Sequence, residues 1–315
     1  EGDPPFPDGV EEGVEVKPGE MWGPPLTGFV LSTTFEVPAD WEKAALFLPL
    51  GDAGDFNHPE ALVYIDGVSS ASCDRYHHEI MLDAGVRDGK AHRLDLHGWT
   101  GGIDLSESWK RSSQAAETGF MLMQQCEVVE IHGPTRQLAQ LMSAALGVIR
   151  GMEADNPVCG LLLNVLNDVL MGLDTRAPLG AAFYASVPDA LVLLQEGLRK
   201  SGPAMNVDIA AVGHAHIDVA WLWTLEQARQ KARRSFSNMI RLMGEYPEFR
   251  FAQSQAQLYE YILNDDPELF AAIKSRVEEG RWEPVGGMWV ESDSNLIGPE
   301  SMVRQFLLGR EFFQC

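Results

Sequence analysis

Strand-forming residues are grouped in short stretches along the first third of the chain. Four stretches are rich in β-branched and apolar residues or alternate apolar with polar positions, namely residues 27–37, 44–50, 61–65 and 91–97. Asp66-Gly67, directly after the third stretch, is a typical hairpin turn. Short strands separated by Gly, Pro and Asp are typical of β-sandwiches, so we predict a β-sandwich domain at residues 1–115.

The hydrophobic period lengthens in the middle of the chain. Apolar residues recur there at helical spacing, at Leu138, Leu141, Met142, Ala145 and Ile149 and again at Leu162, Val165, Leu166 and Val169. This pattern predicts a small helical linker region at residues 116–205.

From residue 206 onward, strand and helix patterns alternate. Strands are predicted at residues 207–212, 250–253 and 282–290, and helices at residues 224–245, 257–263, 266–280 and 298–313. Two helix starts carry capping signals, which are Thr224 with Gln227 and Asp266 followed by Pro267. The alternation predicts a parallel α/β sheet, whose ligand sites lie beyond the carboxyl ends of the strands.

The composition narrows the classes of partner. The chain is 45% hydrophobic, and its 46 acidic residues outnumber 24 basic ones, which gives a formal net charge of -22. This charge disfavours binding to nucleic acid or to an anionic membrane and is compatible with neutral sugars. The four cysteines are scattered, and neither a signal segment nor a membrane-spanning run is evident, so we expect a cytoplasmic location.

The first candidate site segment is residues 213–223, at the end of a predicted strand. His216 and Asp218 are two residues apart, so on a strand they face the same side, and zinc accepts such a nitrogen and oxygen pair. A hydrogen-bonded His–Asp pair without metal is the alternative. Trp221 and Trp223 are either core residues or platforms for a sugar face, and His214 is interpreted as structural or as supporting His216 from outside.

The second candidate segment is residues 285–295. Its two glycines allow close backbone approach, and Glu291 and Asp293 follow two residues apart. Spacing alone leaves both as candidate solvated carboxylates. Two strand ends would nevertheless direct His216, Asp218 and Asp293 toward one place.

Two other groups of polar residues are open to more than one interpretation. Gln253, Ser254 and Gln255 follow a predicted strand and could hydrogen-bond substrate hydroxyls. A basic run on the predicted helix 224–245 is interpreted as a solvated or salt-bridged face, or otherwise as a subunit contact, and consists of Arg229, Lys231, Arg233 and Arg234.

Both candidate segments resemble the α-mannosidases of glycoside hydrolase family 38, of the cytosolic and microbial type. The resemblance rests on HAHIDVAWLW at 214–223, FAQSQAQLYEYI at 251–262, GGMWVESDSNL at 286–296 and ESMVRQFLLGREFF at 300–313. Weaker similarities at residues 74–79 and 96–101 fit the accessory domain that precedes the catalytic barrel in this type. The resemblance therefore implies that residues 206–315 are the first part of a barrel-like α/β catalytic domain.

The resemblance also implies a site and a mechanism. His216 and Asp218 would be zinc ligands, Asp293 would be both nucleophile and zinc ligand, and Trp221 would line the mannose pocket. Zinc, or cobalt as in some relatives, would bind the 2- and 3-hydroxyls of a terminal mannose in an oligosaccharide. Asp293 would attack the anomeric carbon, and water would open the glycosyl-enzyme with retention.

One departure from the family limits what these residues can do alone. The family has a histidine as fourth metal ligand and an aspartate as general acid downstream of the nucleophile, whereas the last of the eight histidines here is His216. We therefore expect an N-terminal portion of such an enzyme, in which exposed strand edges could favour a homo-oligomer. The alternatives are a deacetylase-like metal-dependent hydrolase and a non-catalytic portion that binds carbohydrate or mediates oligomerisation.

The missing general acid leads to the first testable expectation. Its loss should lower turnover of aryl α-mannosides by about 10²–10⁴-fold or more, so the isolated chain should be nearly inactive. Steady-state release of the aryl alcohol measures this. Turnover near that of an intact family member would contradict it.

Overall fold

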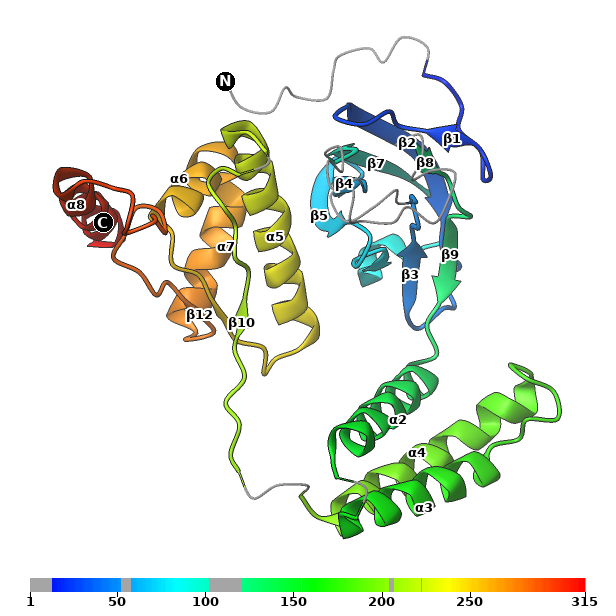
Figure 1. Cartoon of the computed structure of the whole chain (residues 1–315). Helices are drawn as coiled ribbons and strands as arrows, with labels where there is room; N and C mark the ends of the chain where they lie inside the picture. Colours follow the sequence, from blue (N-terminus) through cyan, green and yellow to red (C-terminus); the bar gives the residue numbers. More distant parts are fainter. Residues whose placement is uncertain are drawn as a thin grey trace. The chain divides into compact units, whose positions relative to one another are not determined.

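The computed structural model of the chain describes residues 13–51, 58–101, 120–153, 155–203, 207–221 and 223–314. These residues form two compact units (Figure 1). One unit comprises the described parts of Glu1–Ala39, Ala45–Val129 and Ala211–Cys315, and the other the described parts of Asp40–Ala44 and Glu130–Ala210. The predicted domain boundaries at 115/116 and 205/206 lie outside the described residues.

The amino-terminal strands form antiparallel pairings. The larger sheet has the order β2-β7-β4-β5, with β2 at Gly28–Glu36, β7 at Ala91–Trp99, β4 at Glu60–Ile65 and β5 at Val68–Cys73. A second sheet has the order β6-β3-β9, with β6 at Glu79–Met81, β3 at Ala44–Phe47 and β9 at Glu127–Glu130. A strand pair joins β1 at Met21–Trp22 to β8 at Met121–Leu122, and the 3₁₀ turn η1 is at Ala84–Val86.

The four predicted strands of this region are confirmed, and so is its turn. Asp66 and Gly67 have φ angles of 51° and 81°, which is the left-handed pair that a two-residue hairpin requires between β4 and β5. Strands β8 and β9, however, lie in the range assigned to the helical linker. Both are too short to show an alternating pattern, and they form by pairing with β1 and β3, which are distant in sequence.

The second unit contains the predicted helices. They are α2 at Gly133–Gly151, α3 at Pro157–Gly172 and α4 at Ala181–Ser201. The periodic apolar residues of α2 and α3 pack with α4 in one core, which includes Leu138, Leu166, Val169, Val187 and Leu194. The helical period therefore identified the buried faces correctly.

The carboxyl-terminal part contains a parallel sheet with the order β10-β11-β12. The strands are β10 at Gly213–His214, β11 at Phe251–Ala252 and β12 at Trp282–Glu283. The helices are α5 at Leu225–Glu245, α6 at Ala256–Asp265, α7 at Pro267–Glu278 and α8 at Pro299–Gln314. Order and direction agree with the predicted parallel α/β sheet, and the continuation into a barrel stays a prediction.

Two strand predictions in this part are wrong in extent. Residues 207–212 are not a strand and are exposed, with Ile209 80% accessible, and the predicted strand 282–290 ends after Glu283. The β-branched composition of 207–212 favours a strand, but within the described sheet β10 is an edge strand and pairs only with the two-residue β11. Residues 207–212 therefore have no described neighbour with which to form a backbone ladder.

The predicted helix caps are present. The Thr224 hydroxyl accepts a hydrogen bond from the Gln227 amide at 3.3 Å, and Asp266 Oδ1 accepts one from the Leu269 amide at 3.0 Å. Such caps satisfy amides that have no partner within the helix. Gly280, just after α7, has a φ of 69°, which is the left-handed conformation that favours glycine there.

An aromatic core fixes the sheet against its helices. Trp282 of β12 packs against Phe251 of β11 at 4.6 Å between ring centroids and against Phe236 of α5 at 5.2 Å. The Trp282 indole donates a hydrogen bond to the Tyr259 hydroxyl, which in turn donates to the carbonyl of Gln253. This buried chain of contacts holds the residues directly after β11, where the candidate site begins.

Glycines allow the second candidate segment to pack closely, as the sequence predicts for Gly286. A Cβ atom there would collide with the Ser254 carbonyl. Gly287 has no such close neighbour. Gly309 of α8, however, lies against the Gly287 carbonyl, and a side chain at position 309 would collide with that carbonyl and with the Met288 backbone. The amide of Trp289 donates to the Gln305 carbonyl of α8 at 2.9 Å. Helix α8 therefore supports this segment directly.

A buried carboxylate connects β4 to α5. Glu60 accepts hydrogen bonds from Lys231 at 2.6 and 2.7 Å, from Arg234 at 2.6 Å and from the Trp99 indole at 3.1 Å. Burial alone would raise the pKa of Glu60, but the cations of Arg234 and Lys231, together with a hydrogen bond from His58, hold it well below its usual range.

Pairing extends along the rest of the basic run. Arg229 pairs with Asp265, and Arg233 pairs with Asp266 at 2.9 Å. The interpretation of the run as a salt-bridged face is therefore confirmed.

Within the described residues, no helix combines the length and the apolar character that crossing a bilayer requires.

Replacing Glu60 should destabilise the fold strongly. Glu60→Ala leaves Lys231 and Arg234 without their shared counter-ion, so we expect a loss of about 3–5 kcal/mol in the free energy of unfolding, measured by urea denaturation. The exposed pair of Glu300 with Arg304 provides the control, and Glu300→Ala should cost about 0–1 kcal/mol. Equal losses in the two variants would contradict this assignment.

The same carboxylate should make stability depend on pH. The pKa of Glu60 is lowered in the folded chain, so its contribution is fully present above the pKa of an ordinary carboxyl group. That contribution is lost as the pH falls through the folded value. We expect the difference in unfolding free energy between the wild-type chain and Glu60→Gln to shrink in acid, measured by denaturation at a series of pH values.

Candidate active site

The site is built where the backbone pairing of β10 and β11 stops. Gly213 pairs with Phe251 and His214 with Ala252, and the chain then leaves the sheet at Ala215. His214 Nδ1 lies 2.9 Å from the Ala252 carbonyl oxygen. Since a carbonyl only accepts hydrogen bonds, Nδ1 carries the proton, and Nε2 of His214 has a lone pair available.

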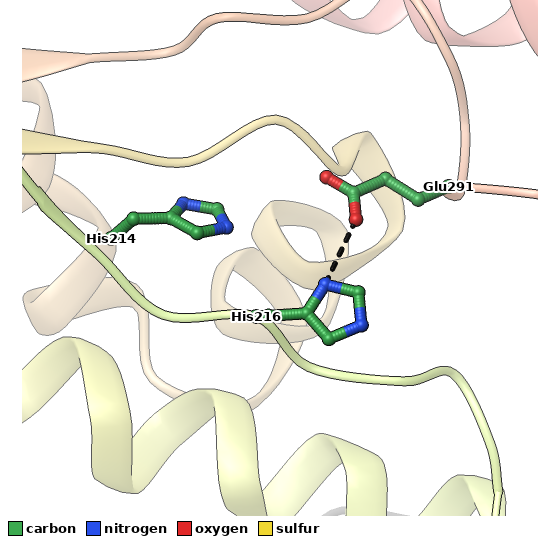
Figure 2. Close-up of side chains that lie close together, drawn as sticks. All are labelled: His214, His216 and Glu291. Carbon is green, nitrogen blue, oxygen red and sulfur yellow. Dashed lines mark ion pairs between the residues drawn. The ribbon is translucent and has the colours of Figure 1, made fainter.

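His216 is the centre of the candidate site. Its Nε2 lies 3.1 Å from Asp218 Oδ1, and its Nδ1 lies 3.1 Å from Glu291 Oε2. Figure 2 shows Glu291 reaching toward His216 from the second candidate segment. All three side chains remain accessible, with 60% of the His216 side chain exposed. A ligand from solvent can therefore reach these atoms.

The His216–Asp218 spacing is that of a direct hydrogen bond, and it is also close to the spacing of two ligands on one metal ion. Zinc bound to a nitrogen and an oxygen at its usual bond lengths, in tetrahedral geometry, separates these two atoms by about 3.3 Å. The observed separation of Nε2 and Oδ1 is 3.1 Å. A histidine that binds metal through one nitrogen commonly donates a hydrogen bond from the other to a carboxylate, and Glu291 is placed to accept it from Nδ1.

A second arrangement involves the same histidine. Among the described residues, the one group of three or more His, Cys, Asp and Glu side chains whose ligand atoms all lie within 4.8 Å is His214, His216 and Glu291 (Figure 2). These three could hold a divalent ion through His214 Nε2, His216 Nδ1 and a Glu291 oxygen. This arrangement uses the opposite nitrogen of His216 and does not include Asp218.

Asp293 lies apart from this group. Its Oδ1 accepts a hydrogen bond from the Asn295 amide at 2.9 Å, and its carbonyl accepts bonds from the amides of Leu296 and Ile297. No described hydrogen bond or ion pair joins Asp293 to His216 or Asp218. The structure thus brings two of the three predicted metal ligands together, and the role of Asp293 stays a prediction. The backbone amide of Asn295 holds the Asp293 carboxylate in its orientation.

The two tryptophans of the first segment differ in their surroundings. The Trp223 indole donates to the Asp218 carbonyl at 3.0 Å, and its ring lies 4.6 Å from the Lys231 ammonium. The Trp221 ring stands edge-on to Trp223 at 5.5 Å between centroids and is 56% exposed. Trp223 therefore supports the segment, while more than half of Trp221 is exposed, and its place in a mannose pocket stays a prediction.

Gln253 and Gln255 do not face substrate in this structure. Both are almost fully buried, at 1% and 3% exposed, and their amide groups bond to backbone atoms of the site segments. Their interpretation as ligands of substrate hydroxyls is wrong, because no part of either amide points to solvent. A Gln-x-Gln pattern alone does not predict that both amides bind backbone groups. Glutamine is nevertheless seldom fully buried, so two glutamines close to a buried strand were the available signal.

Glu291 is the functional candidate that the sequence left undecided. It is exposed and two residues from Asp293, so its spacing resembles that of a solvated carboxylate. Its carboxylate nevertheless contacts both His216 and the Ser254 hydroxyl. The spacing of Glu291 and Asp293, read together with the histidine that follows another strand of the same sheet, was the available signal.

Comparison with known proteins places the chain in a family. Residues 206–315 match the glycosyl hydrolases family 38 N-terminal domain. Alpha-mannosidase G of Dictyostelium discoideum is 51% identical over 306 residues, which are 95% of this chain and 27% of that protein. Alpha-mannosidase 2C1 of Mus musculus is 29% identical over 299 residues, which are 94% of this chain and 28% of that protein.

A third relative matches a smaller share of the chain. An alpha-mannosidase of Saccharomyces cerevisiae is 40% identical over 107 residues, 34% of this chain and 10% of that protein. The chain thus spans little more than a quarter of the length of the first two relatives. Residues 206–315 therefore belong to the glycosyl hydrolase family 38 N-terminal domain, and the similarity to alpha-mannosidases extends over most of the chain.

Proposed function

We propose that the protein containing these residues is a retaining, metal-dependent α-mannosidase that removes terminal mannose from oligosaccharides. The observation that carries the proposal is the pairing of His216 Nε2 with Asp218 Oδ1 at 3.1 Å, at the carboxyl end of a parallel strand. Ligand sites of α/β sheets lie at such ends. The three relatives are all alpha-mannosidases by name, which supports this reaction over other metal-dependent hydrolyses.

The metal site is assigned to His216, Asp218 and Asp293. His216 would bind through Nε2 while Glu291 accepts the proton of Nδ1, and Asp293 would complete the ligands that this chain supplies. Nitrogen and carboxylate donors suit zinc and also cobalt. When bound, the ion would hold the 2- and 3-hydroxyls of the mannose and favour a distorted sugar ring close to the geometry of the oxocarbenium-like transition state.

The chemical steps are assigned to this chain's residues as follows. Trp221 offers an apolar face on which the sugar ring stacks. An Asp293 oxygen forms a bond to the anomeric carbon while the bond from that carbon to the leaving oxygen breaks, and a general acid gives that oxygen its proton. Water then attacks the same carbon, passes a proton to the deprotonated general acid, releases the Asp293 carboxylate and yields mannose with retained configuration. No residue of 206–315 is assigned as the general acid.

Zinc titration of the 315-residue chain tests the metal assignment. Asp218→Asn keeps the side-chain shape and removes the charge, so we expect zinc affinity to fall roughly tenfold or more, measured by competition with a chelating dye. His214→Ala is the matched control and should leave the affinity within roughly twofold, since His214 is not a ligand in this assignment. A large loss in His214→Ala with none in Asp218→Asn would instead favour the His214, His216 and Glu291 arrangement.

Covalent trapping tests Asp293 as nucleophile. A mannosyl fluoride with a second, rate-slowing fluorine on its ring has a leaving group that needs no protonation, so the general acid is not required for the first step. We expect the zinc-loaded chain to gain the sugar mass on Asp293, located by fragment mass spectrometry.

Two variants serve as controls for the trapping. Asp293→Asn should abolish the adduct, whereas Glu291→Gln should retain it on Asp293. A label on Glu291, or no label on a chain that has bound zinc, would overturn the assignment of the nucleophile.

A further inference from the structure

The segment that carries His216 and Asp218 is not held by strand pairing. The backbone ladder of β10 and β11 ends at His214 and Ala252, and residues 215–218 are irregular. The second segment is likewise irregular after Glu283. Side chains placed by such loops keep a fixed geometry only when other groups bind the loop backbone.

Glutamine side chains continue the ladder beyond β11. Gln253 Nε2 donates to the Ala215 carbonyl at 2.7 Å, and Gln255 Nε2 donates to the Ile217 carbonyl at 2.8 Å. The donors alternate along one segment and the acceptors along the other, as the amides and carbonyls of a parallel pair would. The two carbonyls flank His216 in sequence, so these bonds fix the backbone on both sides of it.

The two glutamines differ at their other end. Gln253 Oε1 accepts from the amide of the next residue, Ser254, at 2.8 Å, so that bond is local. Gln255 Oε1 accepts from the Glu291 amide at 3.2 Å, which belongs to the second segment. One buried amide group therefore binds the backbone of both site segments at once. The Ser254 hydroxyl adds a bond to the Glu291 carboxylate.

We propose that Gln255 is a positioning residue that sets the separation of the two site segments. It holds the Ile217 carbonyl, next to Asp218, on one side and the Glu291 amide, two residues before Asp293, on the other. The side chain is 3% exposed, so water does not compete for these bonds. The inference rests on the proposed function, because it assigns Gln255 to the geometry of that same site.

Replacement by methionine removes both bonds at nearly constant volume. In Gln255→Met the Ile217 carbonyl and the Glu291 amide lose their partners, and the buried link between the backbones of the two segments is removed. Gln253→Met is the matched control, because it introduces the same buried side chain and also removes two hydrogen bonds. Those two bonds join Gln253 to Ala215 and to Ser254, and neither involves the second segment. Circular dichroism and thermal melting of both variants establish that they are folded.

Hydrogen exchange of the metal-free chain is the first readout. We expect the Glu291 amide to exchange roughly tenfold faster or more in Gln255→Met and to be unchanged in Gln253→Met. Zinc affinity is the second readout, and it should fall roughly 10–100-fold in Gln255→Met, as for other groups that orient metal ligands, and less in Gln253→Met.

Gln255→Glu covers the case in which the methionine variant does not fold. It keeps an acceptor for the Glu291 amide and loses the donor to Ile217, so exchange at Glu291 should stay slow while the first segment loosens. Unchanged exchange at Glu291 in Gln255→Met, or equal losses of zinc affinity in Gln253→Met and Gln255→Met, would overturn the inference. Failure of the unaltered chain to bind zinc would count against the proposed function instead, and the exchange result would stand without it.

Discussion

Backbone groups that leave a β-sheet still need hydrogen-bond partners, and this requirement governs the site. The parallel pairing of β10, β11 and β12 lasts two residues per strand, so the chain must satisfy the next carbonyls in another way. Buried glutamines do so for Ala215 and Ile217. The first backbone amides of α6, together with α8, do so for the segment around Trp289. The accessible side chains of His216 and Asp218 therefore stand on a backbone that is fixed from the inside.

The aromatic core beneath the sheet also helps to fix the backbone that carries the site residues. Trp282, Phe251 and Phe236 pack face to edge, and the Trp282 indole reaches Gln253 through the Tyr259 hydroxyl. A polar chain of this kind is stable in a dry interior because every member has a partner. The packing below the strand ends thus fixes the backbone, while the side chains of His216 and Asp218 above them remain accessible.

The sequence predicted those features that depend on near neighbours. The hairpin at Asp66-Gly67, the caps at Thr224 and Asp266 and the order of strands and helices follow from local propensity, and His216 with Asp218 follows from the two-residue period of a strand. Strand length at 207–212 was overestimated because pairing depends on a neighbouring strand, which no local pattern reveals. The contact of Glu291 with His216 and the role of Gln255 depend on the register between distant segments. Spacing within one segment cannot show that.

The ion pairs of Glu60 with Lys231 and Arg234 join the matched family domain to a strand outside it. Residues 206–315 match a family domain by sequence, yet Lys231 and Arg234 of that range find their counter-ion on β4, and Lys231 also contacts the Trp223 ring that supports Asp218. Excised at residue 206, the matched region would lose both the carboxylate that pairs with Lys231 and Arg234 and the β strands against which α5 packs. The stretch that matches the family domain is thus smaller than the compact unit in which it packs, and the β strands near the amino terminus belong to that unit.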